Sequence, residues 1–183
     1  MDDWSRYLTT RTGFRLHVRP ARPDDDGTVT EFFSHVTRDD LRFRFLTGLN
    51  AVGPSQVSAL THVDHVRTED FLAFTDDGLT MIATAMLACD AALDRGEVAI
   101  AIREDHKHKG ISWELLAHIA LYAEAKGVST LEAIETRENH AAIELERDMG
   151  FTVAPYPDDP TLVLVSRKLG LKGLSERSIP ASA

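Results

Sequence analysis

The segment EVAIAIREDHKHKGIS, residues 97–112, contains the features that decide the fold. It opens with an apolar run from Val98 to Ile102, which is typical of a strand covered on both faces. The run passes into a short basic segment that ends at Gly110, and an amphipathic helix is expected over residues 111–126. Backbone amides of a glycine-containing loop at a helix N-terminus form a natural phosphate-binding site. The segment therefore predicts a strand, a phosphate-binding loop and a helix, in that order.

The segments on either side extend this pattern into a sheet. A strand is expected over residues 130–136 and a second helix after Asn139, which we expect to cap it. Because a helix connects that strand to residues 98–102, the two strands should run parallel. Asp77 and Gly78 between two apolar runs indicate a hairpin. The preceding strands are therefore expected to form an antiparallel meander over residues 71–75, 79–89 and 97–103.

The remaining patterns complete one domain of the α+β class, with a mixed, mostly antiparallel sheet flanked by helices. Alternating residues predict a strand from Phe14 to Arg19, and apolar residues at helical spacing predict two or three helices up to Val63. Two further strands are expected at residues 151–154 and 161–169. We expect the domain to span residues 14–169, after an N-terminal extension over residues 1–13 with one helical turn and before a flexible tail over residues 170–183.

Charge and composition narrow the range of partners. The formal net charge of −9 argues against nucleic acid, because neutralising phosphates requires a basic face, and it suits a cationic acceptor such as an amine. No apolar run approaches the ~20 residues that a membrane span needs. Cys89 is the only cysteine, which fits a reducing compartment. We therefore expect a cytoplasmic protein without a nucleic-acid or membrane partner.

Two motifs resemble those of the Gcn5-related N-acetyltransferases (GNAT). The family's loop reads Gln/Arg-x-x-Gly-x-Gly/Ala, and Lys107-His108-Lys109-Gly110-Ile111-Ser112 matches it with Lys in the first position and Ser in the last. The segment from Asn139 to Phe151 resembles the family's Asn-x-x-Ala-x-x-Leu-Tyr-x-x-x-Gly-Phe helix. The resemblance implies a GNAT-like fold that binds acetyl-CoA as acyl donor through Ile100, Ala101, Ile102, Lys107, His108, Lys109, Gly110, Ile111, Ser112 and Asn139.

The N-terminal half resembles, more narrowly, the acetyltransferase domain of bacterial Pat-type protein lysine acetyltransferases. The likeness rests on residues 18–25, on Arg42-Phe43-Arg44-Phe45 and on residues 60–64. It implies a free-standing bacterial enzyme whose acceptor is a lysine of a metabolic enzyme, with Glu97 as general base. The Tyr that often reprotonates the leaving thiolate in the wider family is Glu146 here, so the source of that proton stays open.

Several alternatives remain at this point. In the nearest alternative the protein is an acetyltransferase whose acceptor is a small-molecule amine. In the other alternative it is a non-catalytic regulatory module that binds acyl-CoA. A homodimer also stays open. His62 with His65, and His106 with His108, lack the cysteine or carboxylate companions of a zinc site, so we expect no metal.

Overall fold

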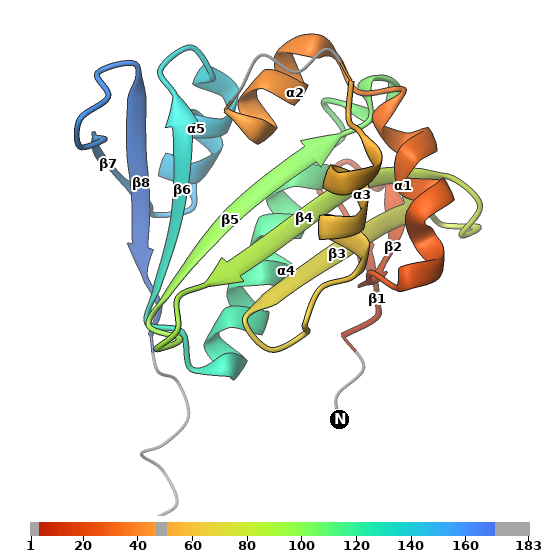
Figure 1. Ribbon diagram of the computed structural model, residues 1–183, viewed down its shortest axis with the longest axis horizontal. Coiled ribbons are helices and arrows are strands. Elements are labelled where there is room, and N and C mark those ends of the chain that lie inside the picture. The colour runs from red at the N-terminus through yellow and green to blue at the C-terminus, as the bar shows by residue number, and fades with distance from the viewer. Residues whose placement is uncertain (1–3, 47–50, 171–183) are drawn as a thin grey trace, which may run out of the picture.

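The computed structural model describes residues 4–46 and 51–170. Eight strands form one sheet in the order β1-β2-β3-β4-β5-β6-β8-β7, and every neighbouring pair is antiparallel except β5 and β6, which are parallel (Figure 1). The strands are β1 (Arg6–Thr9), β2 (Arg15–Pro20), β3 (Thr68–Thr75), β4 (Met81–Cys89), β5 (Arg95–Ile102), β6 (Thr130–Thr136), β7 (Thr152–Pro155) and β8 (Leu162–Lys168). This confirms the expected α+β class and the mostly antiparallel sheet.

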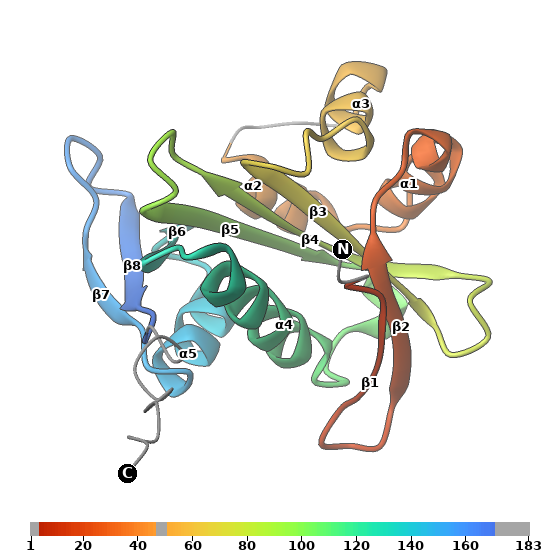
Figure 2. The same cartoon turned by 90° about the horizontal axis from the view of Figure 1, so that it is seen from below.

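Helices cover both faces of the sheet (Figure 2). On one face lie α4 (Ile111–Lys126) and α5 (His140–Asp148), and on the other lie α1 (Asp26–Phe33), α2 (Arg38–Phe45) and α3 (Pro54–Thr61). The apolar stripe of α4 is buried as its spacing predicts, with Ile111, Leu115 and Ile119 in the larger core cluster. No helix within residues 4–46 and 51–170 is long and apolar enough to cross a membrane.

The strand β5 contributes side chains to both cores, because alternate residues of a strand point to opposite faces. Val98, Ile100 and Ile102 pack toward α4 in the larger cluster. Ala101 belongs to the second cluster, which is built from α1, α2 and α3 on the other face. The apolar run of β5 is thus covered on both sides, as its composition predicts.

The parallel pair β5–β6 separates soon after it begins. Its register runs from Arg95 opposite Thr130 to Glu97 opposite Glu132 and ends there. Figure 1 shows the two strands diverging beyond that point, with β6 turning to pair along its whole length with β8. The sheet is therefore open between residues 98–102 of β5 and the second half of β6.

Two details differ from the expectations, and a third cannot be compared with the structure. Residues 6–9 form the edge strand β1 and pair with β2, where one helical turn was expected. Asn139 occupies the N-cap position of α5, but its side chain makes no capping bond and its Nδ2 donates instead to Glu135 Oε2 at 2.7 Å. The expected tail lies outside the described residues from position 171 onward.

Candidate active site

The backbone of β5 offers unpaired groups on the side where the sheet is open. Asp90 N–H donates to Arg95 O and Arg103 N–H donates to Ile82 O, and the β4–β5 register between these bonds is unbroken. In an antiparallel pair the residues bonded across the ladder alternate. The N–H and C=O groups of Val98, Ile100 and Ile102 therefore point away from β4. The Val98 N–H meets Glu132, the last paired residue of β6, whereas the groups of Ile100 and Ile102 face the gap. Ala101, expected as a binding residue, turns its backbone to β4 and its side chain into the core.

The loop between β5 and α4 carries a run of free amides. Within residues 4–46 and 51–170, the N–H groups of residues 108–112 donate to no protein acceptor, whereas Lys107 N–H is bonded to Glu104 O. His108 and Gly110 have positive φ angles of 61° and 82°, and α4 begins directly after Gly110. Consecutive amides in such a conformation, at the positive end of a helix dipole, form a concave anion site. The phosphate-binding loop that the sequence predicts is therefore geometrically available.

Gly110 is required here for two reasons. A φ of +82° lies in the left-handed region that side chains rarely adopt. A Cβ at this position would also lie 3.3 Å from Thr10 Cβ, and Thr12 Oγ1 donates to Lys109 O at 3.1 Å. The β1–β2 turn thus packs against the loop from outside.

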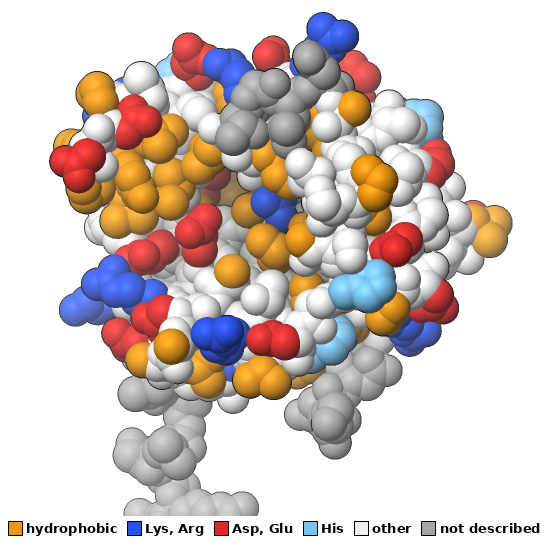
Figure 3. All heavy atoms as spheres, viewed as in Figure 1, with side chains coloured by type: hydrophobic (Ala, Val, Ile, Leu, Met, Phe, Trp, Pro, Cys, Tyr) orange, Lys and Arg blue, Asp and Glu red, His pale blue; other side chains and the backbone are white. Residues whose placement is uncertain are grey.

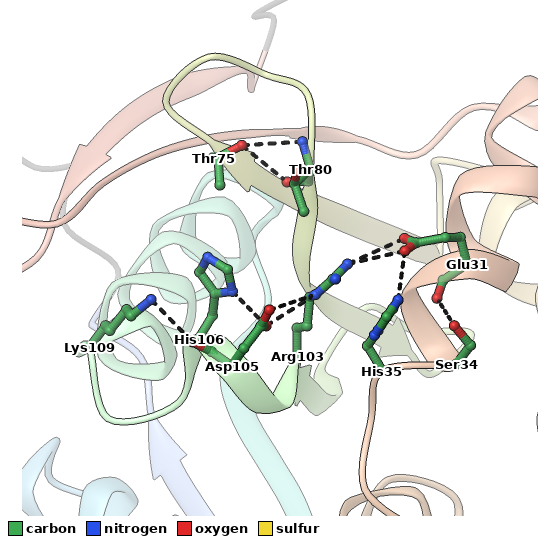
Figure 4. Close-up of polar contacts among 9 residues, drawn as sticks. All are labelled: Glu31, Ser34, His35, Thr75, Thr80, Arg103, Asp105, His106 and Lys109. Atoms are coloured by element: carbon green, nitrogen blue, oxygen red, sulfur yellow. Dashed lines mark hydrogen bonds and ion pairs between the residues drawn. The ribbon is translucent and has the colours of Figure 1, made fainter.

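A polar network braces the start of this loop (Figure 4). Arg103 reaches Glu31 of α1 through Nη1 at 3.2 Å and Asp105 through Nε at 3.0 Å. Asp105 also bonds His106 Nδ1 at 2.7 Å, and the His106 and Arg103 contacts hold the pKa of the Asp105 carboxyl below its usual range. The short 3₁₀ turn Glu104–His106 is thereby tied to α1, which fixes the position of the amides that follow.

The two loop lysines have protein partners of their own. Lys107 Nζ is bonded to Asp40 of α2, so its side chain links the loop to that helix. Lys109 Nζ donates to Asp105 O at 3.2 Å and lies 5.0 Å from the centre of the Phe14 ring. Of the two, only Lys107 lines the cavity described next. The contribution of Lys109 to a ligand therefore comes from its backbone N–H.

One cavity of about 370 Å³ joins the loop to the open part of the sheet. Figure 3 shows the hollow on the face of the molecule below α2, with acidic side chains at its edge. All the expected binding and catalytic residues line it apart from Lys109. The lining residues from that set are Glu97, Ile100, Ala101, Ile102, Lys107, His108, Gly110, Ile111, Ser112 and Asn139.

Glu97 lies where this cavity meets a second, outer groove of about 540 Å³. Its side chain is exposed and makes no hydrogen bond or ion pair within the described ranges. Besides Glu97, the outer groove is lined by Glu132 of β6 and by Tyr156 and Asp158 of the β7–β8 loop. An amine that enters along these carboxylates would reach Glu97 at the mouth of the inner cavity.

Two carboxyl groups line the inner cavity on the side of β6 and α5, the half-buried Glu135 and the buried Glu146, and the sequence patterns did not assign them a role. Burial raises the pKa of Glu135 to about 7, although its bond from Asn139 acts in the opposite direction. Burial, and then the neighbouring Glu135, raise the pKa of Glu146 to about 9. Glu146 is only 5% exposed, and its Oε2 has no hydrogen-bond partner among the described residues. The sequence signal for Glu146 was its position in the α5 motif, where the wider family often has Tyr.

These features are those of an N-acetyltransferase fold: a parallel pair that opens, a loop of free amides at a helix N-terminus, and a cavity that joins them. The family model described as "Acetyltransferase (GNAT) family" matches residues 53–151. The chain belongs to this family and is an acetyltransferase of the GNAT type.

Solved structures show the same architecture. The chain is similar to the GNAT domain of S. lividans PAT, with a TM-score of 0.84 and 25% identity over 91% of this chain and 97% of that one. It is also similar to spermidine N-acetyltransferase from Vibrio cholerae in complex with CoA and spermine, with a TM-score of 0.68, 14% identity and coverage of 84% and 95%. A cAMP-binding acyltransferase from Mycobacterium smegmatis matches with a TM-score of 0.63 and 18% identity, over 91% of this chain and 47% of that one. The last two likenesses show the fold alone.

Proposed function

We propose that the chain transfers the acetyl group of acetyl-CoA directly to a protein lysine, with Glu97 as general base. The observation that carries this proposal is the juxtaposition, in one cavity, of a loop with five free amides and a carboxylate, none of which has a protein partner within the described residues. The same geometry fits direct transfer, in which donor and acceptor meet at Glu97 and no covalent enzyme intermediate forms.

The donor would be held from both ends. The amides of residues 108–112 bind its diphosphate, and the free edge of β5 pairs with the amides of its pantetheine arm, much as a peptide adds to a sheet. Ile102 lies five positions after Glu97, a span of roughly 16 Å along β5. The N–H of Ile100, beyond the last β5–β6 pair, then lies where it can polarise the thioester oxygen.

The acceptor amine must lose a proton before it attacks. A lysine amine has a reference pKa near 10.4, so its neutral form at pH 7 costs roughly 4.6 kcal/mol. Glu97 accepts that proton as the amine nitrogen bonds to the thioester carbon. The outer groove, with Glu132 and Asp158 beside Glu97, attracts a cationic side chain to this point.

The leaving thiolate needs a proton when the carbon–sulfur bond breaks. Glu146 lines the cavity and holds its proton at neutral pH, because burial raises its pKa to about 9. That pKa lies near the ~8.5 of a thiol, which suits proton transfer between the two groups. Glu146 is therefore the general acid in this proposal, and solvent restores its proton after product release.

Protein lysine is favoured as acceptor by the 25% identity to the Pat-domain structure and by the open, acidic outer groove. A small-molecule amine is the second candidate, supported by the same acidic lining. A panel of acceptors separates them: a lysine-rich acyl-CoA synthetase, a blocked free lysine and spermidine, each present at the same concentration of reactive amine. Selective thiol release with the protein supports the proposal, and equal or better turnover of spermidine supports the small amine.

The enzyme assignment itself is tested by thiol release from acetyl-CoA with wild type, Glu97→Gln and Glu144→Gln. Glu144 lies exposed on α5 and serves as the matched control. We expect Glu97→Gln to bind acetyl-CoA normally and to lose roughly 10²–10⁴-fold in kcat, with Glu144→Gln unchanged. Equal background rates for wild type and Glu97→Gln, with acetyl-CoA bound to both, would instead identify a binding module without turnover.

A further inference from the structure

A guanidinium lies on the floor of the cavity, close to the proposed base. Arg44, in the last turn of α2, lines the inner cavity together with Glu97. Its Nη2 lies 3.9 Å from Met86 Sδ, and its guanidinium carbon lies 5.1 Å from the centre of the Phe45 ring. Its Nε is enclosed and has no acceptor within the described residues. Arg44 thus brings a positive charge into the reaction site without a hydrogen-bonded carboxylate.

The sheet register places a carboxylate on each side of this guanidinium. Met86, beneath it, is paired with Asp70 on β3 and with Ala99 on β5. Glu97 lies two residues from Ala99 and therefore points to the same face, in a position diagonal to Met86, at roughly 7–8 Å and somewhat less between Cβ atoms. Arg44 accordingly lies between Asp70 and Glu97 above the β3–β4–β5 floor.

Asp70 is an unusual neighbour because it is completely buried. Its exposed fraction is 0%, Thr84 Oγ1 donates to Oδ1 at 2.6 Å, and Oδ2 has no partner in the described part of the chain. Burial raises the pKa of Asp70 to about 7, against the lowering effects of Thr84 and Arg44. Burial likewise lowers the pKa of Arg44, although an arginine side chain stays protonated in proteins. Asp70 is thus fully buried and Arg44 is half-buried on the same face of the sheet, with no hydrogen bond or ion pair between the two within the described residues.

The other charged groups around Arg44 have separate contacts or lie at the rim. Lys107 is bonded to Asp40, and Arg95 is bonded to Glu132. The remaining acidic residues facing the two cavities are Asp158 of the β7–β8 loop, Glu135 of β6 and Glu146 of α5, with His106 and His108 on the loop side. Among the Lys and Arg residues that line the inner cavity, Arg44 is the one without an ion-pair partner in the described residues.

We propose that Arg44 is a positioning residue that keeps Glu97 ionised and keeps the incoming amine neutral. A fixed cation repels an ammonium group and attracts a carboxylate. It therefore favours a carboxylate on Glu97 together with a neutral amine, the combination from which transfer can start. Asp70 holds the guanidinium down on Met86, which keeps it from approaching the reacting atoms. This inference rests on the proposed function, because it concerns the same base and the same amine.

The test is the pH dependence of kcat/KM for thiol release with Arg44→Gln and Arg44→Lys. Gln removes the charge and Lys retains it in a side chain of similar length. We expect the acidic limb of Arg44→Gln to move to higher pH by about one unit, with recovery toward the wild-type rate above the limb, and Arg44→Lys to keep the wild-type limb. Asp70→Asn removes the negative charge that opposes Arg44, so the acidic limb of this variant should not move to higher pH.

The outcomes separate this inference from the function on which it rests. If Arg44→Gln loses the same fraction of activity at every pH, or if Arg44→Lys shifts the limb as far as Gln does, Arg44 has only a structural role. Acetyl-CoA affinity and thermal stability are measured for each variant. If Arg44→Gln fails to fold, Arg44→Met takes its place as the uncharged variant that is compared with Arg44→Lys. If the wild type itself releases no thiol with any acceptor, the proposed function fails first.

Discussion

Glu97 lies opposite Glu132 in the last step of the β5–β6 ladder, immediately before the two strands separate. The two carboxylates differ in their contacts. Glu132 is bonded to Arg95, whereas Glu97 has no ion-pair partner within residues 4–46 and 51–170. The opening of the sheet therefore begins at the one carboxylate of the pair that is available for proton transfer.

Replacing Glu132 should affect the binding of the acceptor and leave the chemical step unchanged. In Glu132→Gln the groove loses one attracting charge and Arg95 loses its partner, so we expect the KM of a lysine acceptor to rise by roughly two- to fivefold. The kcat should remain that of the wild type. Steady-state kinetics at fixed acetyl-CoA measure both values, and a fall in kcat as large as that of Glu97→Gln would show that the two carboxylates have been assigned the wrong roles.

Gly110 should be needed for the acyl donor and not only for the fold. In Gly110→Ala the positive φ of 82° and the 3.3 Å approach to Thr10 force the loop to shift, at a cost of about 1 kcal/mol in stability. Gly78→Ala is the matched control, because Gly78 has a φ of 74° in the β3–β4 turn with no atom within 4 Å of the added Cβ. Denaturant unfolding should show similar losses for the two variants.

Acetyl-CoA binding should distinguish the same two glycine variants. The shift in Gly110→Ala moves the amides that hold the diphosphate, so its affinity should fall, whereas Gly78→Ala should bind like wild type. Calorimetric titration measures this difference. Equal affinities for Gly110→Ala and Gly78→Ala would mean that the loop does not bind the donor.

The buried acid Glu146 should make stability depend on pH. Burial raises its pKa from an ordinary 4.5 to about 9, so the folded chain holds this proton more tightly than the unfolded chain. The resulting stabilisation is fully present below about pH 4.5 and is lost progressively as the pH rises toward 9. Glu146→Gln removes this dependence, and its advantage in unfolding free energy should grow by up to about 1.4 kcal/mol per pH unit between those values.

Denaturant unfolding at several pH values measures this advantage, with Glu144→Gln as the control on the exposed side of α5. Parallel stability curves for wild type and Glu146→Gln would show that Glu146 is ionised in the folded state. In that case it could not donate a proton to the thiolate.

Local sequence patterns were enough to predict the frame of the site. The helix over residues 111–126, the strand over residues 130–136 and the glycine that precedes α4 follow from periodicity and turn chemistry. Because each of these signals is contained within one element, it does not depend on how distant segments pair. The strand expected over residues 97–103 is of the same kind, and the observed β5 begins two residues earlier, at Arg95.

The polar groups inside the cavity could not be predicted in this way. Arg44 and Asp70 are 26 positions apart in a sequence that gives no sign that they are neighbours, and the β3–β4–β5 register together with α2 brings them to one face. Asn139 was expected to cap α5, but its Nδ2 donates to Glu135 on β6 and its side chain makes no capping bond. Tertiary contacts decide such cases, and the edge strand β1 is another example, because its pairing with β2 outweighs its weak local signal.

The central claim is that the free amides of residues 108–112 hold the diphosphate of the acyl donor. It is tested most directly by calorimetric titration of the wild-type protein with acetyl-CoA and, separately, with acetyl-pantetheine, which has the same thioester and no diphosphate. We expect measurable heat with acetyl-CoA and an affinity for acetyl-pantetheine that is at least roughly tenfold weaker, because the charge-assisted bonds to the loop are lost. Equal affinity for the two compounds, or no binding of acetyl-CoA, would contradict it.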